Sequence, residues 1–193
     1  MELTDAEIIE KSLDDPNAFG MVFERYYDTI FRFVARRQGL EPAADLTADV
    51  FARAFSLRGR YDTTRESCRP WLYGIASNII GDEIRRQRRS ERRHLAMIGL
   101  QGESDDPYGR ADDKLAAQQE ASRLHGSLAS LRSRDRNVLL LYSIEELSYQ
   151  EIADALNIPV GTVRSRLSRA RRKISELETQ LEQTKLRDQR KKP

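Results

Sequence analysis

The sequence contains 193 residues, of which 39% are hydrophobic and 33% are charged. A chain of this length can form one or two small domains with hydrophobic cores. It has no apolar run of about eighteen residues, and it begins with the acidic segment MELTDAEIIEKSLDD. We therefore expect no membrane insertion, no secretory signal and a cytoplasmic location. A single cysteine excludes an internal disulfide bond.

The net charge of +2 is small, but the charged residues are unevenly distributed. Acids concentrate near the N-terminus and between Glu103 and Glu120, whereas bases concentrate at residues 85–93, at residues 164–173 and in the tail KLRDQRKKP. Arginine outnumbers lysine, and its planar guanidinium group suits phosphates and bases. Segments of the chain, rather than the chain as a whole, are therefore candidates for contact with nucleic acid.

Helical periodicity dominates the N-terminal half, and no convincing strand pattern occurs. Thr4 and Glu7 have the spacing of a capping box for a first helix. Asp15 and Pro16 indicate a second helix start, which is followed by apolar residues at three- and four-residue steps up to about Gly39. Two further helices are expected at residues 43–57 and 69–89, separated by the polar loop LRGRYDTTRES.

The helical pattern decays after Ser90 and resumes near Ala121. The segment between them contains GLQGESDDPYGRADD, whose glycine, proline and acids are typical of a flexible linker. We therefore expect an all-α protein made of two small helical domains joined by a flexible linker. The expected organisation is a domain at residues 1–90, an acidic linker at 91–121, a second domain at 122–181 and a basic, disordered tail at 182–193.

The segment LSYQEIADALNIPVGTVRSRLSRARRKI has the layout of a helix-turn-helix. Ser148 and Glu151 form another capping-box spacing, and Pro159 disfavours helical geometry in the residue before it. A new helix is expected from about Val160. One apolar stripe of that helix contains Val163, Leu167, Ala170 and Ile174. Basic residues fill the remaining circumference, so the helix can dock on its own domain and enter the major groove.

Two other interpretations of this basic helix fit less well. A solvated helix usually mixes charges of both signs to limit repulsion, whereas GTVRSRLSRARRK contains no acid. A helix that lies on a membrane surface needs a broad apolar face with aromatic residues, and this stripe is narrow and has none. Contact with DNA is the favoured interpretation.

The expected helix at residues 69–89, RPWLYGIASNIIGDEIRRQRR, places Asn78, Asp82 and Arg85 on one face. Aromatic, amide and arginine side chains beside a polar loop suit unpaired bases, which stack on aromatic rings and are recognised at their edges. For Trp71, packing in the core is favoured over contact with a base, because an aromatic residue in a helix is more often part of the core. The alternative for Asn78 and Asp82 is simple exposure to solvent.

The expected helix at residues 43–57 contains Asp45 and Asp49 one turn apart, with Phe51 and Phe55 on another line. No histidine or glycine-rich loop lies nearby in the sequence to complete a catalytic or metal site. We therefore expect no enzymatic activity, no metal and no cofactor. An acidic, partly apolar face suits a protein partner with a basic surface.

Four segments in this order resemble those of the bacterial sigma factors, specifically the two-domain extracytoplasmic-function (ECF) group of the sigma-70 family. They are AFGMVFERYYDTIFRFV, DLTADVFARAF, PWLYGIASNIIGDEIRRQRR and the helix-turn-helix segment. The resemblance extends from about Pro16 to Ile174. It implies a subunit that binds core RNA polymerase, directs promoter-specific initiation and helps to melt the promoter, without catalysing a reaction itself.

The resemblance also implies a role for each constellation. The partners are the beta-prime clamp helices and beta flap of core polymerase, promoter DNA and an anti-sigma factor. The implied polymerase-binding residues are Asp45, Asp49, Phe51 and Phe55. The implied contacts with the minus-ten element are Arg58, Tyr61, Arg69, Trp71, Asn78, Asp82, Arg85 and Arg86. The implied contacts with the minus-thirty-five element are Thr162, Arg164, Ser165, Arg166, Arg169 and Arg172.

The sequence departs from the family pattern in two places. Glu146 stands where family members often have glycine, so the turn before the helix-turn-helix is expected to differ. The basic tail lies outside the family core, and disorder, added DNA affinity and contact with a regulator are all open for it. The competing function is that of a helix-turn-helix repressor or activator that acts without being a polymerase subunit. A nuclease would need the metal or acid–base cluster that the sequence lacks.

Overall fold

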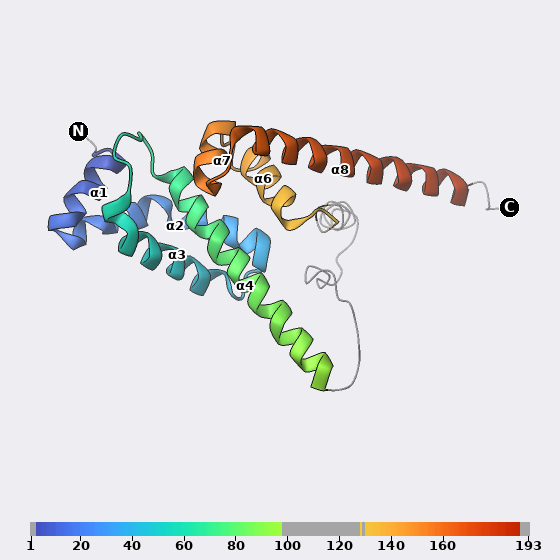
Figure 1. The fold of residues 1–193 in the computed structure, drawn as a ribbon, viewed down its shortest axis with the longest axis horizontal. Coiled ribbons are helices and arrows are strands. Elements are labelled where there is room, and N and C mark those ends of the chain that lie inside the picture. The colour runs from blue at the N-terminus through green and yellow to red at the C-terminus, as the bar shows by residue number, and fades with distance from the viewer. Residues whose placement is uncertain (1–2, 98–127, 129, 190–193) are drawn as a thin grey trace. The chain divides into compact units, whose positions relative to one another are not determined.

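The structure is a computed structural model that describes residues 3–97, 128 and 130–189 (Figure 1). Every regular element in this part of the chain is helical, which confirms the predicted all-α fold class. The chain divides into two units, the first containing α1 to α4 and the second containing α6 and α8 with most of α7. None of the described helices combines the length and apolar character needed to cross a membrane.

The first unit forms where local sequence signals predict helices. Its elements in chain order are α1 (Asp5–Asp14), the 3-10 turn η1 (Pro16–Phe19), α2 (Gly20–Gln38), α3 (Ala43–Leu57), the 3-10 turn η2 (Arg58–Arg60) and α4 (Arg69–Met97). The predicted capping box is present, because Thr4 N donates to Glu7 Oε2 at 2.7 Å and Glu7 N donates to Thr4 Oγ1 at 3.2 Å. Asp15 caps η1 by accepting a hydrogen bond from Asn17 N at 3.1 Å.

The core of the first unit lies between α2, α3 and α4, which pack against one another. Apolar residues at three- and four-residue steps on each helix face this core. Its fully or almost fully buried members include Val22, Ile30, Phe33, Val34, Val50, Ala54, Leu72, Tyr73 and Ile80. The rings of Phe33 and Tyr73 meet edge to face with centroids 4.9 Å apart. Burial of each large apolar side chain contributes about 1.5–3 kcal/mol, so these contacts fix α4 against α2 and α3.

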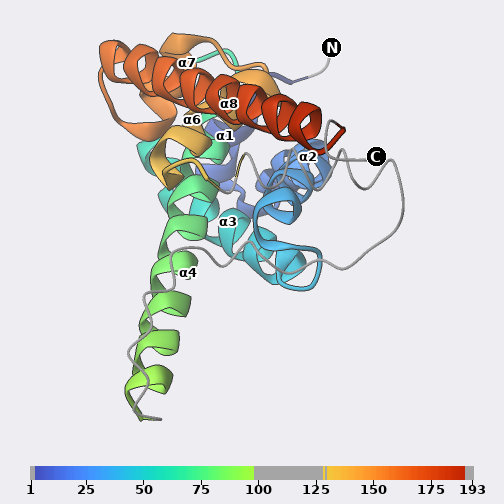
Figure 2. The ribbon, with the colours of Figure 1, turned by 90° about the vertical axis from the view of Figure 1, so that its right-hand side faces the viewer.

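Helix α4 is longer than predicted. It continues to Met97 rather than ending near Arg89, because no glycine or proline interrupts the segment RRSERRHLAM. Both views show its later turns extending beyond α2 and α3 (Figures 1 and 2). Residues 91–97 of the expected linker are therefore helical, and residues 98–121 of that linker lie outside the described residues.

The second unit contains the predicted helix-turn-helix. Its helices are α6 (Ser133–Ser143), α7 (Tyr149–Leu156) and α8 (Val160–Gln189). The capping box predicted for α7 is present, with Ser148 N donating to Glu151 Oε2 at 2.8 Å and Glu151 N to Ser148 Oγ at 3.2 Å. Asn157, between α7 and α8, has a left-handed φ of 50°, which asparagine tolerates better than most residues.

The predicted apolar stripe attaches α8 to its own unit. Val163, Leu167 and Ala170 are at most 2% exposed, whereas Ile174 is half-buried. Helix α8 packs against α6, and Figure 1 shows its later turns running past the end of α6. Because α8 continues to Gln189, residues 182–189 of the expected tail are helical rather than disordered. Residues 190–193 lie outside the described residues.

Candidate nucleic-acid and polymerase surfaces

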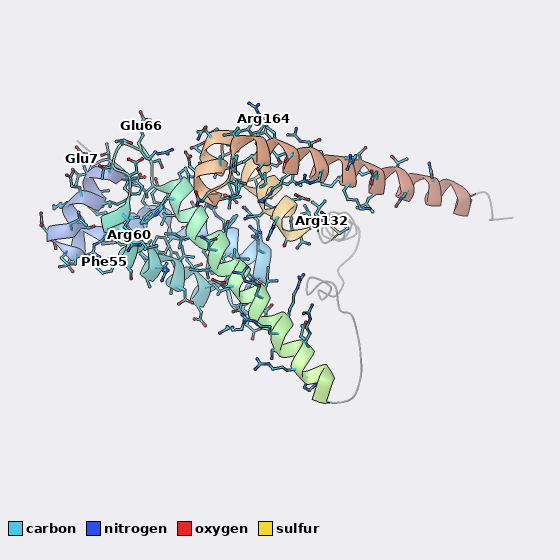
Figure 3. The ribbon with its side chains drawn as sticks, in the orientation of Figure 1. Glu7, Phe55, Arg60, Glu66, Arg132 and Arg164 are labelled. Atoms are coloured by element: carbon cyan, nitrogen blue, oxygen red, sulfur yellow. The ribbon has the colours of Figure 1, made fainter. Side chains whose placement is uncertain are left out.

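The first turns of α8 present basic side chains opposite the buried stripe. Arg164, Ser165, Arg169 and Arg172 are exposed, and Thr162 and Arg166 are half-buried. Arg164 projects from α8 on the side away from α6 (Figure 3). This arrangement follows from the helical period, which separates the stripe and the basic residues onto different faces. The described surface of α8 can therefore meet DNA without loss of its internal packing.

The six residues of α8 that are predicted to contact DNA differ in their partners within the protein. Arg169 Nη2 lies 3.2 Å from Oδ1 of Asp135, a residue of α6 that is 6% exposed. Arg172 Nε lies 3.8 Å from Glu176 Oε1, a distance typical of a weak surface pair. Among the residues that the structure describes, Arg164 and Arg166 have no acidic partner. Arg169 therefore takes part in the fold, and Arg164 is the better candidate for a side chain dedicated to DNA.

A groove between α3 and α4 brings together residues that the sequence analysis assigned to different tasks. It has a volume of about 560 Å³, and its lining includes Asp49 and Arg53 from α3 and Asn78, Ile79 and Asp82 from α4. Asp49 was predicted to contact polymerase, whereas Asn78 and Asp82 were predicted to contact the minus-ten element. Their side chains are exposed, so one groove offers both carboxylates and an amide to a partner.

The basic end of α4 continues from this groove. Arg85 pairs with Asp82, and Arg86 Nη2 lies 2.6 Å from Glu83 Oε2. The arginine side chains of both pairs are largely exposed, so these contacts contribute little to stability. Beyond them, a surface hollow of about 400 Å³ is lined by Arg86, Arg89 and Arg93. Arg89 and Arg93 lie outside the predicted set, although their three- and four-residue spacing in the sequence placed them on one side of the helix.

The loop at residues 61–68, hereafter the α4-entry loop, exposes polar side chains between two buried ends. Residues 62–66 are exposed, whereas Tyr61 and Cys68 are buried. Asp62 accepts hydrogen bonds from Thr64 N at 3.1 Å and Thr64 Oγ1 at 2.6 Å, which is the geometry of an Asx turn. Figure 3 shows Glu66 pointing outward from this loop.

Four residues predicted to contact the minus-ten element also make contacts within the first unit. Tyr61 is 9% exposed and its ring centroid lies 5.2 Å from that of the half-buried Trp71, so packing accounts for both rings. Arg58 donates to Phe55 O at 2.7 Å and to Ser12 O at 3.2 Å. The guanidinium of Arg69 lies 5.6 Å from the Tyr73 ring centroid. These four residues therefore make contacts within the unit, and their contact with DNA stays a prediction.

Of the four predicted polymerase-binding residues, two are exposed and two pack within the unit. Asp45 and Asp49 are exposed on α3, whereas Phe51 is 4% exposed and its ring centroid lies 4.9 Å from that of Phe23. Phe55 is half-buried beneath the Arg58 guanidinium, which lies 3.8 Å from its ring centroid. The side chain of Phe51 therefore lies within the unit, and its contact with polymerase stays a prediction.

Asp5 was missed by the sequence analysis, because it looked like an ordinary acid in the first turn of a helix. The residue is 3% exposed. Burial alone would raise the pKa of its carboxyl, but hydrogen bonds from Tyr26, the Cys68 backbone and Arg25 outweigh burial and lower that pKa below its ordinary value of 3.8. No local signal distinguishes such an acid from an exposed one, because its partners lie far along the chain.

Comparison with known proteins assigns the family. The family model of sigma-70 region 2 matches residues 22–90, and that of sigma-70 region 4 matches residues 121–174. The ECF RNA polymerase sigma factor SigW of Bacillus subtilis is 31% identical over 163 residues, which cover 81% of this chain and 87% of SigW. The ECF sigma factor SigC of Mycobacterium tuberculosis is 34% identical over 142 residues, which cover 74% of this chain and 73% of SigC.

Solved structures of similar fold agree with this result. CnrH, solved in complex with the cytosolic domain of CnrY, matches with a TM-score of 0.64 and 25% identity, covering 91% of this chain and 97% of CnrH. The sigma factor RpoE of Bartonella quintana, co-crystallised with the anti-sigma factor NepR, has the same fold, with a TM-score of 0.59 and 22% identity over 84% of this chain and 98% of RpoE. The chain belongs to the ECF sigma factors of RNA polymerase, which are transcription initiation factors with a DNA-binding region 4.

Proposed function

We propose that this chain joins core RNA polymerase and directs initiation at promoters with separate minus-ten and minus-thirty-five elements. The observation that carries the proposal is the exposed basic face of α8 opposite its buried stripe, on a chain that also carries a second polar surface on its first unit. The polymerase, rather than this chain, makes RNA. The expected location is the cytoplasm, where the transcription machinery lies.

The second unit recognises the minus-thirty-five element through α8. Arg164 and Arg166 suit phosphates or guanine edges, since arginine forms bidentate hydrogen bonds with both. If roughly four to six bases contact phosphates, log affinity falls with log salt at a slope of about −4 to −5. Arg169 contributes to DNA binding through its charge, and through its ion pair with Asp135 it also holds α8 in place.

The first unit reads and helps to open the minus-ten element. Asn78 and Asp82 in the groove can hydrogen-bond base edges, and the α4-entry loop of the same unit presents further exposed polar residues. Capture of an unpaired base offsets part of the unstacking cost of a few kcal/mol. Arg89 and Arg93 extend this surface with charges that suit the phosphate backbone.

Asp45 and Asp49 on α3 form the contact with the clamp helices of polymerase, since exposed carboxylates suit a basic partner surface. The beta flap is the partner expected for the second unit. A regulatory protein of the anti-sigma type also binds this chain. Support for this partner comes from CnrH, which was solved with the cytosolic domain of another protein, CnrY.

The experiment that separates this function from that of a repressor or activator is a gel-shift assay on promoter fragments with and without core polymerase. A sigma factor forms its specific complex when core polymerase is present. A helix-turn-helix regulator shifts duplex DNA equally well alone, and that result would contradict the proposal. The regulator hypothesis explains α8 but gives no role to the groove between α3 and α4.

A further inference from the structure

Four donors converge on the buried carboxylate of Asp5. Arg25 Nη1 donates to Oδ1 at 2.5 Å, and Tyr26 Oη donates to Oδ2 at 2.5 Å. The backbone N–H of Cys68 donates to Oδ2 at 2.8 Å, and Ser67 Oγ donates to the same oxygen at 3.2 Å. Two donors come from α2 and two from the end of the α4-entry loop, so one side chain joins three separate segments.

This connection continues into α4. Ser67 Oγ also accepts a hydrogen bond from the backbone N–H of Arg69, the first residue of α4, at 3.2 Å. At the other end of the loop, Tyr61 packs against Trp71. The α4-entry loop is therefore attached at both ends, and Asp5 forms the attachment nearest to the start of the helix that carries Asn78.

We propose that Asp5 is a positioning residue, which holds the α4-entry loop and the start of α4 in the conformation that meets the minus-ten element. The inference rests on the proposed function of this surface, and it assigns to α1 a role in promoter opening. Asp5 itself contacts no DNA. It acts through Ser67 and Cys68, which precede α4.

The carboxylate is suited to this task because both of its oxygens accept hydrogen bonds, which are strong when the acceptor is charged. An asparagine offers one acceptor oxygen and places an NH₂ group against the remaining donors. Asp5→Asn therefore keeps the shape of the side chain but releases part of the loop attachment. Ser67→Ala removes one of the two loop contacts and leaves α1 and α2 connected.

The sole tryptophan of the chain reports directly on the loop, because Trp71 packs against Tyr61. We expect Asp5→Asn to shift its emission to longer wavelength and to increase quenching by acrylamide about twofold, with a smaller increase in Ser67→Ala. The matched control is Thr4→Ala, which removes the cap of the same helix and leaves the side chain of Asp5 unchanged. That control should leave Trp71 emission unchanged.

The functional test uses the full chain with core polymerase on a promoter carrying 2-aminopurine in the minus-ten element. We expect Asp5→Asn to slow the rise in fluorescence about tenfold, as the loss of a hydrogen bond to a charged group predicts. Affinity for the upstream duplex and for core polymerase should match those of Thr4→Ala. Equal opening rates in Asp5→Asn and Thr4→Ala would overturn the inference.

The two assays distinguish failure of this inference from failure of the proposed function. If the wild-type chain opens the promoter but Asp5→Asn behaves like Thr4→Ala in both assays, Asp5 has no positioning role. If the wild-type chain opens no promoter, the proposed function fails, and Trp71 quenching still decides whether Asp5 holds the loop.

Discussion

The guanidinium of Arg169 pairs with the buried carboxylate of Asp135 across α8 and α6, with Nη2 and Oδ1 3.2 Å apart. The Asp135 side chain is 9% exposed, whereas the Arg169 side chain is 46% exposed. One end of the pair therefore belongs to the interior of the second unit and the other lies at its basic face. Arg169 couples the position of α8 to the rest of its unit, unlike Arg164, which projects freely.

This difference predicts separate effects for two alanine substitutions. Arg164→Ala should weaken duplex binding by about 1–3 kcal/mol if the side chain reads a base, or reduce the salt slope by about one if it contacts a phosphate. Its melting temperature should match that of wild type. Arg169→Ala should weaken binding and also lower the free energy of unfolding by about 1–3 kcal/mol, because it leaves Asp135 without its ion pair.

Fluorescence anisotropy at several salt concentrations, together with thermal unfolding, measures both effects. Asp135→Asn is the matched control, since it removes the ion pair and keeps every base on α8. It should lower stability and leave the salt slope close to that of wild type. Equal destabilisation by Arg164→Ala and Arg169→Ala would contradict the assignment.

Glu146 predicts a stabilising substitution. Its φ of 55° lies in the left-handed region, which costs a side-chain-bearing residue roughly 1–2 kcal/mol. Glycine removes this cost, but it also makes the unfolded chain more flexible, which offsets part of the gain. Glu146→Gly should therefore raise the free energy of unfolding by about 0.5–1 kcal/mol. Chemical denaturation measures the change. Glu146→Ala keeps the strain and should show no comparable gain; a gain of the same size would indicate another cause.

Local signals predicted the parts of the fold that depend on neighbours in the sequence. Both capping boxes formed, since Thr4 with Glu7 and Ser148 with Glu151 need only residues three positions apart. Helix α3 has the predicted bounds of residues 43–57. At Glu146, where the family pattern places glycine, the backbone has the left-handed conformation that glycine favours, and the expected difference in this turn stays a prediction.

Features that depend on distant contacts were not predictable in this way. Asp5 binds partners 20 to 63 positions away, and its burial therefore depends on how three segments pack. The helical period predicted that Phe51 and Phe55 lie on the same face of their helix. Only the packing of α2 against α3 shows that Phe51 is buried. The ends of α4 and α8 were placed too early, because charged sequences without glycine or proline contain no clear stop signal.

Charge reversal at Asp49 tests the polymerase surface. Asp49→Arg should reduce capture of core polymerase at least tenfold, since close like charges at an interface cost several kcal/mol. A pull-down with purified core polymerase measures this. Asp14→Arg, at the exposed end of α1, makes the same change in net charge and should bind normally. Undiminished capture by Asp49→Arg would remove α3 from the interface.

Asn78 tests the role of the groove in promoter opening. Asn78→Ala should reduce permanganate reactivity of unpaired thymines in the minus-ten region about tenfold, because one specific contact to a base contributes about 1–3 kcal/mol. Binding to the upstream duplex should remain unchanged. Ser90→Ala, an exposed change further along α4, serves as the control. A normal permanganate pattern in Asn78→Ala would exclude this residue from opening.

The buried carboxylate of Asp5 predicts a dependence of stability on pH. Its pKa in the folded state is lowered by hydrogen bonds that outweigh burial, so it binds protons less readily folded than unfolded. Its contribution to stability is therefore complete above the ordinary value of 3.8 and is lost as the pH falls through the folded-state pKa. The stability difference between wild type and Asp5→Asn should shrink over this acidic range, as urea denaturation at each pH will show. A constant difference would contradict the lowered pKa.

The most direct test of the central claim is run-off transcription with core RNA polymerase and this protein on a library of promoter fragments. We expect transcripts that depend on the added chain and arise from promoters sharing two separated elements. Arg164→Ala should weaken selection of the upstream element, and Asn78→Ala should weaken selection of the downstream one. Transcription that does not change when the chain is added, together with duplex binding by the chain alone, would show that this protein is not a polymerase subunit.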